Sequence, residues 1–136
     1  MIQAYLKDVL APLFPKLTWS MDYRQAADDT GTVYSESGYP PDQYESGTRR
    51  PSYMVYVRSS DWGYAERAAQ GVFKALHRKE HIPVAIEDTD EEGNVIGIRR
   101  YHVFLITAAT EPLRIGVENG VMEWSVNFDV TLKEEI

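Results

Sequence analysis

The sequence contains no cysteine. It therefore cannot form a disulfide, a thiolate zinc site, an iron–sulfur cluster or a cysteine nucleophile. This composition fits a protein that is made and used in a reducing cytoplasm. Stability must come from a packed core, and a chain of 136 residues can bury about two thirds of its unfolded surface. We predict a single domain over residues 1–136.

Long apolar runs and an excess of positive charge are also missing. No stretch approaches the roughly 20 apolar residues that cross a bilayer. Lys7 and Asp8 interrupt the apolar N-terminus, so we expect no secretory signal. With 21 acidic and 14 basic residues, the net charge is −7. Such a surface attracts neither phosphate backbones nor anionic lipids, so we expect no specific nucleic-acid binding and no membrane binding.

Sequence motifs for catalysis are absent. The chain has no Gly-x-Ser-x-Gly turn and no glycine-rich phosphate loop. His77 and His81 have the i, i+4 spacing of a helical metal site, but Arg78 stands where a metalloprotease needs its glutamate. We interpret both, and His102 on a predicted strand, as ordinary histidines. The sequence predicts a protein that is not an enzyme and holds no cofactor.

An acidic segment at residues 88–94 has oxygen-bearing side chains at alternate positions and Gly93 at the sixth, as in a calcium loop. The twelfth position, which should be a bidentate glutamate, is Arg99. We therefore predict an acidic hairpin turn, with Gly93 in the left-handed conformation, and no metal site.

Two segments have helical periodicity. Residues 2–12 carry apolar side chains at i, i+3, i+4 and i+7, and Pro12 and Pro15 predict the end of that helix. Residues 61–79 repeat the pattern after Asp61, a plausible N-cap, with basic residues at the far end.

The rest of the chain predicts strands. Apolar and polar residues alternate strictly over 122–132, which indicates a long strand with one buried face. Residues 53–57 are β-branched and aromatic. Shorter strands are expected at 17–21, 32–34, 84–87, 95–98, 101–107 and 113–117. The predicted fold is α+β, with two helices packed on an antiparallel or mixed sheet.

Residues 36–51 contain three prolines, two glycines and no aliphatic side chain. This composition predicts a long exposed loop, which we interpret as a contact arm. Tyrosine and arginine are enriched at interfaces. The candidate interaction residues are Tyr39, Tyr44, Arg49, Arg50 and, beyond the loop, Arg58.

The order of these parts resembles the phage tail terminator and minor capsid protein family. The resemblance rests on Tyr34-Ser-Glu-Ser-Gly-Tyr-Pro-Pro41, then Pro51-x-x-x-Val55-x-Val57-Arg58, then the alanine-rich helix from Asp61 to Leu76, and finally Trp124-Ser-Val-Asn127-Phe128-x-Val130. It covers nearly the whole chain.

The resemblance implies a virion protein, assembled in the host cytoplasm, that forms a ring on the head-proximal end of the tail. The ring is usually of six copies. Its partners would be itself, the tail tube protein and the head–tail connector protein. The sequence leaves open two alternatives: a connector or head-completion subunit, and a non-enzymatic cytoplasmic protein-binding module.

Overall fold

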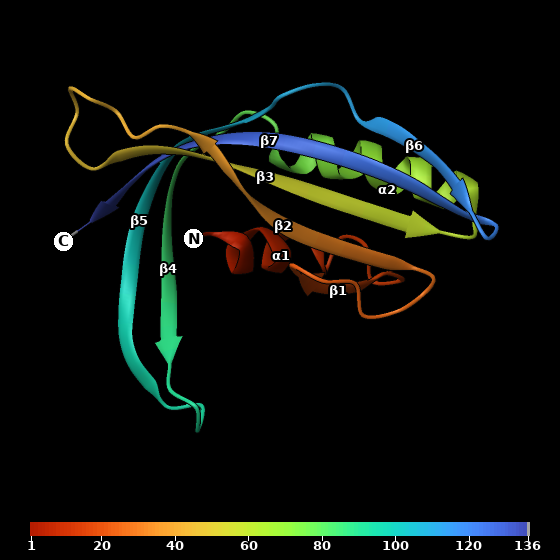
Figure 1. Ribbon diagram of the computed structural model, residues 1–136, viewed down its shortest axis with the longest axis horizontal. Coiled ribbons are helices and arrows are strands. Elements are labelled where there is room, and N and C mark those ends of the chain that lie inside the picture. Colours follow the sequence, from red (N-terminus) through yellow and green to blue (C-terminus); the bar gives the residue numbers. More distant parts are fainter. Residues whose placement is uncertain (136) are drawn as a thin grey trace.

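The computed structural model describes residues 1–135, which form two helices and seven strands (Figure 1). In chain order they are α1 (Gln3–Leu10), β1 (Thr18–Met21), β2 (Thr30–Tyr39), β3 (Thr48–Ser59), α2 (Trp62–Leu76), β4 (Lys79–Thr89), β5 (Val95–Ala108), β6 (Leu113–Glu118) and β7 (Val121–Glu135).

All seven strands belong to one strongly curled sheet. Its order is β1-β2-β3-β7-β5-β4, and β6 pairs with β7 beside this path. β1 and β2 are parallel, and every other pair is antiparallel. The predicted α+β fold with a mixed sheet is confirmed.

Both helices contribute to one hydrophobic core on one face of the sheet. Leu6 and Leu10 of α1 and Val72 of α2 are fully buried, and they pack with Val55 and Phe128 of the two central strands. Tyr53, on the same sheet face as Val55, accepts a hydrogen bond at its hydroxyl from the backbone N–H of Ile2 (3.1 Å). This bond fixes the start of α1 to the centre of the sheet.

The second helix begins where the sequence predicted and ends earlier. Asp61 caps it by accepting a hydrogen bond from the backbone N–H of Tyr64 (3.1 Å). The helix ends at Leu76 rather than near residue 79, because Arg78 adopts a positive φ of 67° and donates its N–H to Ile106. Lys79 then opens β4. Similarly, α1 spans Gln3–Leu10 rather than 2–12.

β7 organises the other strands. It pairs with β3 along one edge, while its other edge is shared between β6 near the start and β5 near the end. The two strands that we expected at 95–98 and 101–107 are one strand, β5, with a register shift between Val103 and Leu105. Figure 1 shows the β4–β5 hairpin leaving the body of the sheet as a projecting arm.

The exposed segment is shorter than the 36–51 that we expected. β2 continues to Tyr39 and β3 begins at Thr48, so residues 40–47 alone join the two strands. Tyr39 pairs with Arg50, and a register shift between Glu36 and Tyr39 accommodates Gly38. The end of β2 and the start of β3 form a ribbon that carries the loop, and β7 pairs beside this ribbon at Thr48 and Arg49 (Figure 1).

Candidate interaction surface

The loop at the end of the β2–β3 ribbon gathers four of the five predicted residues. Tyr39 is 60% exposed and Tyr44 is 92% exposed. Together with Arg50 and the Pro40–Gln43 segment, they line an open pocket of about 530 Å³. Arg49 and Arg50 also line a smaller neighbouring hollow that reaches Met1. An open surface with aromatic and guanidinium groups is suited to contact with another protein.

Asp42 gives this loop its shape. Its carboxylate accepts hydrogen bonds from the backbone N–H groups of Glu45 and Tyr44, both at 2.8 Å, and pairs with the guanidinium of Arg50 at 2.9 Å. These backbone hydrogen bonds, with Arg50 as a further cause, lower the pKa of the Asp42 carboxyl. The turn therefore holds Arg50 against the loop and presents Tyr44 outward.

Arg58 does not belong to this surface. It is 5% exposed, and its Nε donates to Oε1 of Glu123 at 2.7 Å. Its Nη1 donates to the carbonyl oxygen of Ala27 (3.0 Å), while the Tyr56 hydroxyl donates to the other oxygen of Glu123 (2.8 Å). Burial and this bond to Glu123 raise the pKa of Tyr56 to about 12. Arg58 is therefore buried among these partners, and the structure does not bring it together with the other four candidate residues.

The two histidines at i, i+4 spacing do not share a helix face. His77 follows α2, stacks on Phe73 (ring centroids 4.8 Å apart) and accepts the N–H of Ala108 at Nδ1 (3.0 Å). His81 lies on β4 with its Nδ1 3.3 Å from Nε2 of His102. Over residues 1–135 no three histidine or acidic side chains come together as a possible metal site.

The hairpin turn that we predicted at 88–94 is present but shorter, because β4 continues to Thr89 and the turn occupies residues 90–94; Gly93 has a φ of 86°. The Asp90 carboxylate accepts hydrogen bonds from the backbone N–H groups of Glu92 and Asn94, both at 2.9 Å. The N–H of Asn94 and further hydrogen bonds of this turn lower the pKa of Asp90.

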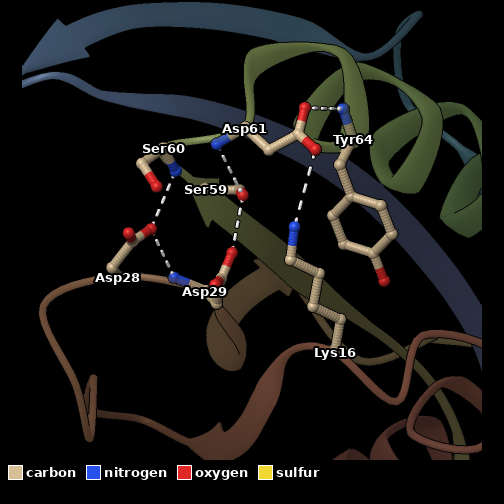
Figure 2. A network of polar contacts seen from close by, with 7 residues as sticks. All are labelled: Lys16, Asp28, Asp29, Ser59, Ser60, Asp61 and Tyr64. Atoms are coloured by element: carbon tan, nitrogen blue, oxygen red, sulfur yellow. Dashed lines mark hydrogen bonds and ion pairs between the residues drawn. The ribbon is translucent and has the colours of Figure 1, made fainter.

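A polar network joins three parts of the fold next to the start of α2 (Figure 2). Asp28 accepts the backbone N–H of Ser60 (2.7 Å), and the Ser59 hydroxyl donates to Asp29 (2.6 Å). Asp61 meets the ammonium of Lys16 at 3.5 Å. Asp28 and Asp61 accept backbone N–H groups, and Asp29 accepts from the Ser59 hydroxyl (Figure 2). Each carboxylate thus has a donor within the protein, which identifies the network as a structural junction.

Sequence reasoning missed the other exposed feature of the molecule. Of the seven large aliphatic side chains that are exposed within residues 1–135, six lie on two elements: Val95, Ile96 and Ile98 on the arm, and Leu113, Ile115 and Val117 on β6. Alternating aliphatic residues in a short strand ordinarily indicate a core-facing side, so the sequence contained no signal of their exposure.

Neither helix in the described part of the chain has the length and apolar character for a membrane crossing. Residues 16–134 match a family model described as bacteriophage tail terminator protein. No curated protein matches the chain.

Proposed function

The chain belongs to the bacteriophage tail terminator protein family, and from that premise we propose that it closes into a ring of roughly six copies on the head-proximal end of the tail tube. The ring would stop addition of tube subunits and present the surface on which the head connector docks. As a component of a phage tail in a structural family, it would act by geometry and not by catalysis.

The observation that carries this proposal is the family match over residues 16–134, which covers most of the chain. The structure supports it with three separate exposed surfaces: the β2–β3 loop, the β4–β5 arm and β6. A ring subunit needs different surfaces for its neighbours, the tube and the connector. The net charge of −7 is consistent with a ring through which DNA passes without being held.

We assign the β2–β3 loop to docking on the tube or the connector. Tyr44 and Arg49 are exposed at its surface, and Asp42 keeps the turn ordered before any partner binds. A preformed loop loses less conformational entropy on binding than a flexible one, which favours affinity.

The test is a tube-capping assay with purified tail tubes. Replacing residues 40–47 with Asn-Gly leaves a four-residue connection between the paired Tyr39 and Arg50. It should leave the fold intact, because none of residues 40–47 is buried, and should abolish docking. Neutralising Arg49 and Arg50 to Gln should weaken docking, whereas neutralising Lys74 on the exposed side of α2 should not. A loop-deleted protein that still caps tubes and binds connectors would refute this role.

A further inference from the structure

We propose that the arm of one copy docks on β6 of the next, so that the two aliphatic patches form the repeating contact between subunits. This inference rests on the proposed ring. The arm patch is Val95, Ile96 and Ile98, which are 49–69% exposed, and the β6 patch is Leu113, Ile115 and Val117, which are 43–52% exposed.

Clustering of the exposed aliphatic residues identifies these patches as contact sites. Single exposed aliphatic side chains are normal on a soluble protein, but here six of seven occupy two short segments. Val95, Ile96 and Ile98 lie together at the start of β5, opposite the register shift between Asp88 and Thr89. β6 pairs with β7 alone within residues 1–135, so its other edge is open for a neighbouring chain.

The positions of the patches favour a head-to-tail contact between identical chains. In Figure 1 the arm projects from one end of the molecule, and β6 lies at the opposite end. Two different patches on one subunit produce a heterologous contact, which generates a ring if the rotation closes. The chain thus supplies both halves of its own interface.

Charge disfavours contact between two arms. The turn of the arm is acidic, with Asp90, Glu91 and Glu92 all exposed, whereas β6 carries one exposed base, Arg114, and one exposed acid, Glu118. Arm-to-arm contact would bring two acidic turns together. Arm-to-β6 contact would place the acidic turn beside Arg114.

The absence of native cysteine allows a direct test by disulfide mapping. Ile96→Cys and Ile115→Cys proteins are prepared separately, oxidised alone and as a mixture, and compared with Glu66→Cys, an exposed control position on α2. We expect a reducible dimer that joins Ile96→Cys to Ile115→Cys in the mixture, and far less from either protein alone. Self-linkage of Ile96→Cys as the main product, or equal linkage through the control, would overturn the proposal.

A charge exchange gives a second readout that does not depend on cysteine. Arg114→Glu should weaken association by about tenfold, and adding Glu91→Lys and Glu92→Lys should restore it. If the added substitutions weaken association further, the pairing is wrong. If rings form but the mixed cross-link does not, the arm-to-β6 contact is refuted and the proposed ring is not. Failure to form rings both in solution and on tube ends would refute the ring as well.

Discussion

The buried ion pair between Arg58 and Glu123 gives a quantitative test of how the open face of the sheet is stabilised. The two side chains are 6% and 12% exposed, and their charged atoms lie 2.7 Å apart. Substituting Glu123 with Gln keeps the shape and leaves the guanidinium buried without a counter-charge. Removing one partner of a buried pair costs about 3–5 kcal/mol. Because the carbonyl oxygen of Ala27 still accepts one guanidinium N–H in a part-buried hydrogen bond, we expect the lower end, about 3 kcal/mol.

The assay is urea unfolding followed by tryptophan fluorescence. The double variant Arg58→Met/Glu123→Gln should recover most of the loss, because no buried charge remains and the methionine fills the space. The control is Asp88→Asn, which breaks the exposed pair with Arg99 (2.9 Å) and should cost at most about 0.5 kcal/mol. A loss below about 1 kcal/mol for Glu123→Gln, or a double variant as unstable as the single one, would refute the reasoning.

Three further predictions concern the core, the ribbon and pH. Leu6→Ala should lower the free energy of unfolding by about 3 kcal/mol in urea, whereas Leu13→Ala, at a 55% exposed site, should change it by less than about 0.5 kcal/mol; equal effects would contradict the burial of α1. Gly38→Ala should raise hydrogen exchange along the ribbon, since Gly38 has a φ of 73° and an added Cβ would meet the backbone of β3; Gly97→Ala, with open space around it, should not. The pKa of Tyr56 is raised to about 12 in the folded protein, so its contribution to stability is present below pH 10 and is lost as pH rises from about 10 through 12. Tyr56→Phe should remove that part of the alkaline decline in urea titrations, and an unchanged decline would contradict the assignment.

Local patterns were sufficient for the elements that build the core. The strict alternation over 122–132 predicted β7, because one face of that strand is buried along its length. Asp61 and the alanine-rich repeat after it predicted α2, since the cap and the apolar stripe are both local features. Where the local pattern itself marks the buried face or the cap, the sequence predicted the element.

Features that depend on distant partners were missed. Residues 36–39 belong to a strand although they are polar and exposed, because pairing with the backbone of β3 holds them. Arg58 has an unremarkable sequence context, and its burial depends on Glu123, 65 positions away. The exposure of Ile96 and Ile115 is likewise set by the curl of the sheet and the projection of the arm, which no local pattern records.

The energetics of the proposed contact set the conditions for observing a ring. Burying six half-exposed aliphatic side chains supplies roughly 1 kcal/mol each, or about 6 kcal/mol per contact. Association costs about 4–15 kcal/mol in lost freedom, so one such contact alone holds two copies weakly. Closing the ring adds one contact without adding a subunit, and binding to a tube end would raise the local concentration of the subunits. We therefore expect rings at high protein concentration or on tubes, with monomers at low concentration.

The most direct test of the ring is the absolute mass of the purified protein by light scattering, over a range of concentrations and with short tail tubes present. We expect a shift from the 15.5 kDa chain to one discrete species near six times that mass, either with rising concentration or when tubes are added. A mass that stays at one chain under both conditions, or that grows without limit into open filaments, would contradict it.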